Sequence, residues 1–296
     1  MKKITAFLQL MRPANIVTAV ADVLAGITIA GYFNNAHFDF AYIWPVILLC
    51  ASTKGLYGGG VVFNDVFDAE LDKIERPERA IPSGVVSLKE ATALGSVLLL
   101  IGLVCAFIVN PVSGILAFLT AASALIYDKW GKHQNYLGPV NMGICRGLNL
   151  LLGISIIPME LNSWWFLSLA PVVYIAAITM ISRGEVHGGK PVTLYFAAFL
   201  YSLVIASILY QAYSQNNLLF ALLILFPFAW IIFLPLFNAV KDPVGKNIGK
   251  AVKAGVLALI IMNASWAAAF GAIIPAIAIF LLLPLSIKLA GLFAVT

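Results

Sequence analysis

The chain has 296 residues, of which 62% are hydrophobic and only 10% are charged. Soluble domains carry about a quarter charged residues, so this composition excludes that class. Apolar runs of about 18 residues or more recur along the whole length, and no alternation with a period of two favours a barrel. The sequence predicts an all-α protein that crosses a membrane several times. Its net charge of +5 then reflects topology rather than a nucleic-acid partner.

Ten apolar segments are candidate spans, and the connections between them alternate in charge. The spans are expected at about 14–33, 41–63, 91–109, 112–128, 138–157, 163–182, 192–211, 217–238, 253–270 and 272–290. Nearly all basic residues outside the spans fall in the N-terminal segment and in 64–90, 129–137, 183–191 and 239–252. The positive-inside rule places these segments in the cytoplasm. We expect residues 1–296 to form one integral, multi-pass domain of an inner or plasma membrane, with a cytoplasmic N-terminus.

A cluster of polar residues follows the second span. Asn64, Asp68 and Asp72 recur every four residues, and Asp65 lies three residues before Asp68. Residues three and four apart on a helix are neighbours, so these groups would line one face. Three carboxylates repel each other unless a cation lies among them, and Mg²⁺ takes oxygen ligands together with phosphate oxygens or water. The pattern favours a magnesium site, with a solvated acidic helix end as the alternative.

A basic loop with two prolines and a final glycine follows, reading Arg76-Pro77-Glu78-Arg79-Ala80-Ile81-Pro82-Ser83-Gly84. The N-D-x-x-D-x-x-x-D spacing of 64–72 and this loop resemble the first aspartate motif of the UbiA superfamily of intramembrane prenyltransferases. Met11–Asn15 resembles the start of that family's first helix. The resemblance implies nine core transmembrane helices, with 272–290 as a candidate tenth. It also implies that Mg²⁺ on a prenyl diphosphate is held by Asn64, Asp65, Asp68 and Asp72, and that Arg76 and Arg79 hold the phosphates.

The stretch after the sixth span departs from the family's second aspartate motif. Residues 181–191 keep one carboxylate, Glu185, and add Arg183, His187 and Lys190. Glu185 is a candidate ligand for Mg²⁺, whereas Arg183 and Lys190 could bind phosphate in place of a second metal. His187 is a weak candidate ligand, and the alternative is a plain basic loop. The Ser-Arg-Gly-Glu run also resembles the divergent UbiA-like EboC proteins.

Charged residues inside or at the ends of spans need partners or a cavity. Arg146, in the fifth span, could bind diphosphate, pair with Asp68 or extend to water. Asp128 ends the fourth span and either adds a charge to the site or belongs to an interfacial loop. Asp22 and Lys54 lie at similar depths in the first two spans. We therefore expect an ion pair between Asp22 and Lys54.

These observations predict a membrane-embedded prenyltransferase whose site faces the cytoplasm. Asp65, Asp68 and Asp72 are the candidate catalytic residues through Mg²⁺, which would act as a Lewis acid on the diphosphate. The candidate substrate-binding residues are Arg76, Arg79, Arg146, Arg183 and Lys190. An aromatic or lipid acceptor would capture the allylic cation. The alternatives are a relative that binds or transports an isoprenoid or aromatic metabolite, and an ion-coupled transporter, which leaves the spacing of 64–72 unexplained.

Overall fold

The computed structural model describes residues 3–35, 40–134, 136–186 and 188–293, and helices make up most of this part of the chain. Nine helical segments of the described ranges are long and apolar enough to cross a membrane. The number is ten if α1 (Lys3–Met11) and α2 (Pro13–Ile29), which meet at 40°, form one broken span. The prediction of a polytopic all-α membrane protein is confirmed. The candidate tenth span is among the nine, as Ile273–Leu292.

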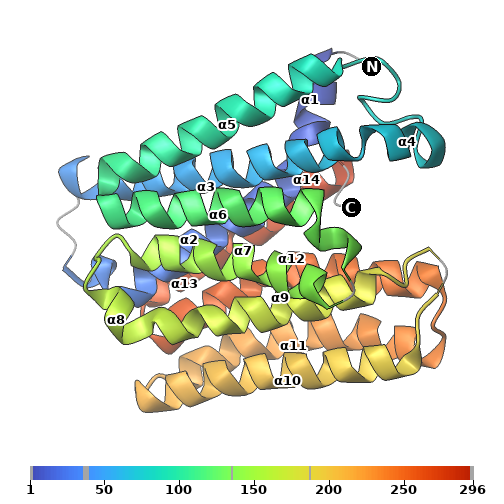
Figure 1. Ribbon diagram of the computed structural model, residues 1–296. Coiled ribbons are helices and arrows are strands. Elements are labelled where there is room, and N and C mark those ends of the chain that lie inside the picture. Colours follow the sequence, from blue (N-terminus) through green and yellow to red (C-terminus); the bar gives the residue numbers. More distant parts are fainter. Residues whose placement is uncertain (1–2, 36–39, 135, 187, 294–296) are drawn as a thin grey trace.

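The remaining long helices follow the predicted order. They are α3 (Phe40–Phe67), α5 (Leu88–Val109), α6 (Pro111–Lys129), α7 (Leu137–Ile154), α9 (Leu169–Ser182), α10 (Pro191–Ser214), α11 (Leu218–Lys241), α12 (Gly245–Ala269), α13 (Ile273–Phe280) and α14 (Leu282–Leu292). Short elements join them: η1 (Tyr32–Asn35), α4 (Ala69–Glu75), η2 (Gly131–His133), α8 (Glu160–Trp164) and η3 (Trp165–Ser168). Figure 1 shows α4 at one end of the bundle and α8 at the other.

Helix starts follow local chemistry. Pro13, Pro111 and Pro191 each occupy the first turn of a helix, where the missing N–H would have no intrahelical partner. Ser87 begins α5 with a capping box, in which its hydroxyl accepts from the Glu90 N–H and the Glu90 carboxylate accepts from the Ser87 N–H. These residues determine where α2, α5, α6 and α10 begin.

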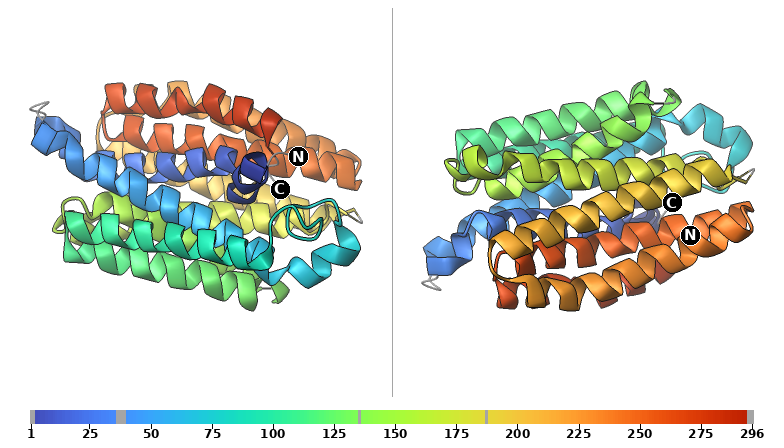
Figure 2. Two further views of the ribbon diagram at one scale, coloured as in Figure 1. Left: turned by 90° about the horizontal axis from the view of Figure 1, so that it is seen from above. Right: turned by 90° about the horizontal axis from the view of Figure 1, so that it is seen from below.

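The long helices run close to one common direction, and α2 and α12 lie at the centre of the bundle (Figures 1 and 2). α2 packs on α3, α7, α12 and α14, while α12 packs on α2, α9, α11 and α13. Both central helices are buried along most of their length. The outer helices α5, α10 and α11 expose many Leu, Ile, Phe and Val side chains. An apolar exterior around a buried centre suits a protein whose solvent is lipid.

Glycines bring α2 and α7 into backbone contact. A Cβ atom at Gly26 would lie 2.3 Å from the Leu150 carbonyl oxygen, and one at Gly153 would lie 2.2 Å from the Val23 carbonyl oxygen. No side chain fits in either place, and small residues are what membrane helices use for such close approach. The contact places Asp22 of α2 within reach of Arg146 of α7.

Candidate active site

A cavity of about 490 Å³ lies among α2, α3, α4, α6, α7, α9 and α12. Charged residues gather in the part formed by α4, the loop that follows it and η2. Apolar side chains form much of the remaining wall, contributed by Leu56, Val61, Ala124, Met142, Ile175, Ile178, Val252, Val256 and Leu259. The site therefore combines a charged mouth with an apolar interior, which suits a substrate with an ionic head and a hydrocarbon tail.

Asn64, Asp68 and Asp72 all line the cavity. α3 ends at Phe67 and α4 begins at Ala69, yet the helical turn continues through the junction. The Asp68 N–H donates to the Asn64 carbonyl oxygen at 3.0 Å, and the Asp72 N–H donates to the Asp68 carbonyl oxygen at 2.8 Å. The i, i+4, i+8 spacing thus places these three side chains on one face toward the cavity.

Asp65 is not among the residues that line the cavity. Its carboxylate accepts from Arg12 Nη2 at 3.1 Å and from Arg79 Nη1 at 3.3 Å. Arg12 is the residue between α1 and α2, and its φ of 47° is left-handed. Pro13 disfavours the right-handed helical conformation for the residue before it, which accounts for the break in the helix at this position. The structure therefore places Asp65 outside the cavity lining, where it anchors two guanidinium groups, and Arg79 Nη1 links it to Asp72.

Basic side chains already neutralise the carboxylates of the mouth. Arg79 Nη1 donates to Asp72 Oδ2 at 2.8 Å, and Lys132 of η2 forms an ion pair with Asp68. Arg76 also lines the cavity. Lys132 is the functional candidate that sequence reasoning missed. The available signal was a lysine four residues after Asp128, which was itself a candidate for the site.

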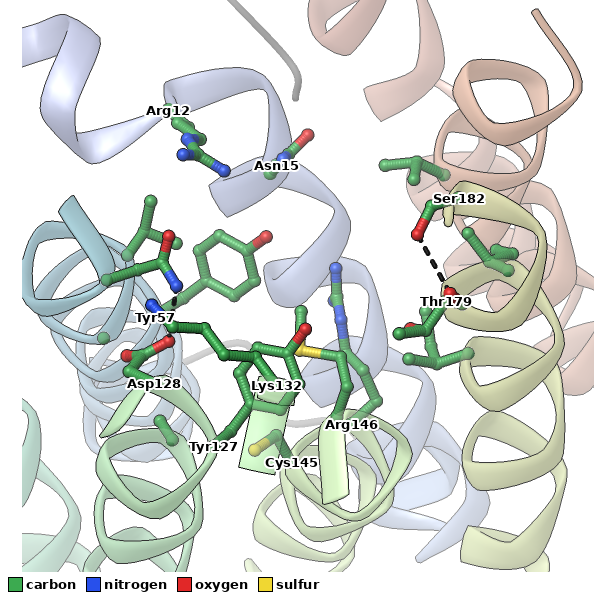
Figure 3. A pocket seen from close by; sticks show the side chains of 18 of the residues that line it. Arg12, Asn15, Tyr57, Tyr127, Asp128, Lys132, Cys145, Arg146, Thr179 and Ser182 are labelled. Atoms are coloured by element: carbon green, nitrogen blue, oxygen red, sulfur yellow. Dashed lines mark hydrogen bonds between the residues drawn. The ribbon is translucent and has the colours of Figure 1, made fainter. Parts of the chain in front are cut away.

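Asp128 lies inside the site rather than in an ordinary interfacial loop. Its Oδ1 accepts from Asn64 Nδ2 at 2.9 Å, and the residue is buried at the cavity wall. Figure 3 shows this hydrogen bond joining α3 to the end of α6, with Lys132 beside it. The bond leaves the Asn64 side-chain oxygen available as an acceptor toward the cavity.

From the second-motif loop, Glu185 lines the cavity, whereas Arg183 and Lys190 do not. Arg183 Nη2 donates to the Gln134 carbonyl oxygen at 2.7 Å, and Lys190 is exposed before α10. Glu185 Oε1 is buried and has no hydrogen-bond partner among the described residues. Burial raises the pKa of Glu185 above its ordinary value, and the charge of Arg76 opposes that shift. His187 lies outside the described residues.

The predicted pair between Asp22 and Lys54 is wrong. Asp22 Oδ2 instead accepts from Arg146 Nη1 at 2.6 Å, and Lys54 is exposed. A helix turns by about 100° per residue, so it is Thr53 of α3 that faces this region and donates to Asn149 at 2.7 Å. Arg146 therefore neither extends to water nor pairs with Asp68, although it does line the cavity.

The donor set of the mouth suits a hard cation. Asn64, Asp68, Asp72, Asp128 and Glu185 offer only oxygen donors, which are the ligands that Mg²⁺ prefers. No group of three acidic, histidine or cysteine residues in the described ranges is yet arranged around a common point. Arg79 and Lys132 contact these carboxylates instead. The residues fit magnesium by their chemistry, provided that the basic side chains turn away from the carboxylates.

Curated relatives and solved structures resemble this chain. Digeranylgeranylglyceryl phosphate synthase from Methanococcoides burtonii is 32% identical over 161 residues, 52% of this chain and 55% of the relative. The protein of the same name from Sulfurisphaera tokodaii is 30% identical over 179 residues, 60% of this chain and 61% of the relative. The chain thus spans little more than half the length of these relatives. A UbiA homolog from Aeropyrum pernix K1 matches with a TM-score of 0.67 and 19% identity, covering 84% of this chain and 96% of that one.

A second solved structure adds ligands to the comparison. The UbiA homolog from Archaeoglobus fulgidus bound to GPP and Mg²⁺ has a TM-score of 0.58 and 14% identity, covering 90% of this chain and 99% of that chain. At this identity the likeness concerns the fold alone. The family model described as the UbiA prenyltransferase family matches residues 23–240, which include the aspartate face, the basic loop and the second-motif loop. With that match across most of the bundle, the chain belongs to the UbiA prenyltransferase family.

Proposed function

We propose that this protein transfers a prenyl group from a Mg²⁺-bound prenyl diphosphate to an aromatic or lipid acceptor. The observation that carries the proposal is the mouth of the cavity. Asn64, Asp68 and Asp72 form one face there, and basic residues from two other segments line the same space above apolar walls. Oxygen donors and cations side by side suit a metal-bound diphosphate, and the walls suit its hydrocarbon chain.

Asn64, Asp68 and Asp72 would hold the metal, with Asp128 fixing the orientation of Asn64. Bound Mg²⁺ would neutralise the diphosphate and act as a Lewis acid on the leaving group. Arg79 and Lys132 now bond to carboxylates, and on substrate binding they would turn to phosphate oxygens. The carbon–oxygen bond then breaks with both electrons leaving on diphosphate. The acceptor forms the new bond to the allylic carbon and loses a proton.

Arg12 and Arg146 line the cavity but pair with Asp65 and Asp22, and the other basic residues divide into two groups. Arg76, Arg79 and Lys132 line the cavity and are our proposed phosphate contacts. Arg183 and Lys190 do not line it, so their predicted contact with phosphate would need the 183–190 loop to move. Glu185 reaches the site from the described part of this loop and would be a further ligand of the metal. We keep the similarity of this loop to the EboC proteins as a prediction, together with a cytoplasmic site and N-terminus.

The experiment that tests the function is transfer by purified protein in lipid. Labelled geranyl and geranylgeranyl diphosphates are offered with aromatic and glycerol-ether acceptors, with Mg²⁺ or with EDTA. We expect a prenylated product and free diphosphate only with Mg²⁺, and neither from Asp68→Asn. Lys129→Met is the matched control, because Lys129 is exposed beside Trp130 and does not line the cavity. Equal turnover of the Asp68→Asn and unmodified proteins would refute the assignment.

A second candidate function is binding or transport of an isoprenoid or aromatic metabolite without chemistry. The second motif favours it, because among the described residues of 183–190 only Glu185, a single carboxylate, lines the cavity. Under this alternative, labelled prenyl diphosphate binds with Mg²⁺ and is recovered intact with every acceptor. Release of diphosphate in the same reactions would exclude it.

A further inference from the structure

Four buried polar side chains form a cluster beside the cavity, on the side away from the mouth. They are Asp22, Arg146, Asn149 and Asn263, and we call them the floor cluster. The carboxylate of Asp22 accepts from Arg146 Nη1 at 2.6 Å, from Asn263 Nδ2 at 2.6 Å and from Asn149 Nδ2 at 3.1 Å. All four are at most 4% exposed. The cluster joins α2, α7 and α12 and has no net charge.

The floor cluster is continuous with the cavity through Arg146 and Asn149, which line it. Arg146 Nη2 also donates to Thr18 Oγ1 at 2.6 Å, so the guanidinium is held on two sides. Its central carbon lies 5.0 Å from the ring centre of Tyr57, another residue of the cavity wall. The positive charge of Arg146 at this part of the cavity wall is therefore balanced by Asp22 and fixed in position.

Tyr57 carries the polar group that the cluster leaves unused. The structure gives its hydroxyl no hydrogen bond with the described residues, and Figure 3 shows the side chain projecting into the cavity beside Arg146. Tyr57 precedes Asn64 by seven residues, about 10 Å along α3. About two helical turns thus separate Tyr57 from the first residue of the aspartate face, roughly the length of a small acceptor.

We infer that the floor is an acceptor subsite, in which Tyr57 hydrogen-bonds an uncharged polar group such as a hydroxyl or carbonyl. Asp22 and Arg146 are positioning residues that hold the ring of Tyr57. An acceptor carboxylate or phosphate at this place would be a buried charge without a counter-charge, because Asp22 has already neutralised Arg146. Any anionic group of the acceptor belongs at the mouth, with the basic side chains. The acceptor role of the floor rests on the proposed transfer reaction. The absence of net charge at the floor can be tested whether or not the protein catalyses that reaction.

The charge of the floor can be measured with a thiol probe. Cys145 lines the cavity next to Arg146, and the other cysteines, Cys50 and Cys105, are outside the lining and can be replaced by alanine. The probes are the anionic sulfonatoethyl and the neutral hydroxyethyl methanethiosulfonates. The ratio of their rate constants at Cys145 reports the local potential, and comparison between variants cancels the effect of the mouth.

Asp22→Asn leaves Arg146 charged, because a guanidinium does not lose its proton in proteins. We expect the anionic-to-neutral rate ratio to rise by about tenfold, as for one buried charge acting over a few ångströms. The double variant Asp22→Asn with Arg146→Gln restores neutrality and should return the ratio to that of the parent. A folded Asp22→Asn protein with the parent's ratio would overturn the inference. So would a double variant that stays as high as the single one.

A second measurement needs no change at Asp22. With Mg²⁺ and a non-cleavable prenyl thiodiphosphate bound, matched acceptor pairs compete with the neutral reagent for Cys145. The pairs are 4-hydroxybenzyl alcohol with 4-hydroxybenzoate, and dodecylglycerol with its phosphate. We expect the benzyl alcohol to protect at concentrations about tenfold lower than the benzoate, because the carboxylate of the benzoate would have to lie either beside the bound thiodiphosphate or against the neutral floor. Tyr57→Phe should weaken protection by the benzyl alcohol several-fold. Better protection by the benzoate, or no protection by any of the four, would overturn the acceptor subsite.

The two arms separate this inference from the proposed function. A changed rate ratio without any prenyl transfer would leave the neutral floor standing and reject the enzyme. Mg²⁺-dependent transfer with an unchanged ratio would reject the neutral floor and leave the enzyme standing.

Discussion

Gly153→Ala should force α2 and α7 apart. The new Cβ atom would lie 2.2 Å from the Val23 carbonyl oxygen, whereas ordinary contact begins at 3.4 Å, so the backbones must separate by 3.4 − 2.2 = 1.2 Å. The Arg146–Asp22 hydrogen bond, now 2.6 Å long, spans the same helix pair. A separation of that size along the bond would stretch it to about 2.6 + 1.2 = 3.8 Å, beyond hydrogen-bonding distance.

The cost has two parts. Overpacking a close contact costs about 1–3 kcal/mol, and leaving buried polar groups unsatisfied costs about 1–3 kcal/mol more. Together these give a loss of roughly 2–6 kcal/mol in the free energy of unfolding. The measurement is reversible unfolding in mixed detergent micelles, followed by tryptophan fluorescence. Gly249→Ala is the matched control, because nothing lies within 4 Å of a Cβ atom at that helical position.

The control should be neutral or slightly stabilising, since alanine restricts the unfolded chain more than glycine does. The reasoning would be refuted if Gly153→Ala and Gly249→Ala unfolded within about 0.5 kcal/mol of each other, the usual scatter for surface changes. It would also be refuted if the double variant Gly153→Ala with Asp22→Asn lost the full sum of the two single losses in the free energy of unfolding. Two changes that break the same contact should not be additive.

Three further predictions concern the mouth. Asp68→Asn should abolish Mg²⁺-dependent binding of prenyl diphosphate in calorimetry, because it removes a ligand charge, while the fold is retained; unchanged binding would reject the metal site. Lys132→Met should tighten Mg²⁺ binding without substrate, since it frees Asp68, but should weaken diphosphate binding several-fold, and Lys129→Met should do neither. Burial holds the pKa of Glu185 above its ordinary value of 4.5, so the folded state binds the proton more tightly than the unfolded state. Stability should therefore fall as pH rises above about 4.5, and Glu185→Gln should reduce that fall in unfolding measured with EDTA; parallel pH curves for the two proteins would contradict this.

The helical order and the aspartate face could be predicted because both are local. Apolar run length marks the spans, and i, i+4, i+8 spacing puts Asn64, Asp68 and Asp72 on one side wherever the helix lies. Asp65 shows the limit of this argument. One position along the helix is a rotation of about 100°, and that rotation turns its carboxylate toward Arg12 and Arg79 and out of the cavity lining.

Pairings between spans could not be predicted, because they depend on which helices become neighbours. Depth alone suggested Lys54 as the partner of Asp22, but depth does not give the rotation of α3 or the approach of α7. The close contact between α2 and α7, which makes Arg146 the partner of Asp22, depends on Gly26 and Gly153 having no side chain. Lys132 was missed for a related reason, since its reach to Asp68 depends on the short turn η2 rather than on spacing along one helix.

The break at Arg12 connects the site mechanically to the bilayer. α1 carries exposed Ile4 and Leu8 on one side, and buried Ala6 and Leu10 on the other. The lipid interface sets the tilt of a helix of this kind. Arg12, at the end of α1, donates a hydrogen bond to Asp65 through its side chain. A change in the tilt of α1 would therefore shift the guanidinium group of Arg12 and, through Asp65, that of Arg79 at the cavity rim. The rate of the reaction would then depend on the thickness and lipid packing of the membrane. Rate constants measured in micelles would apply to a single tilt of α1.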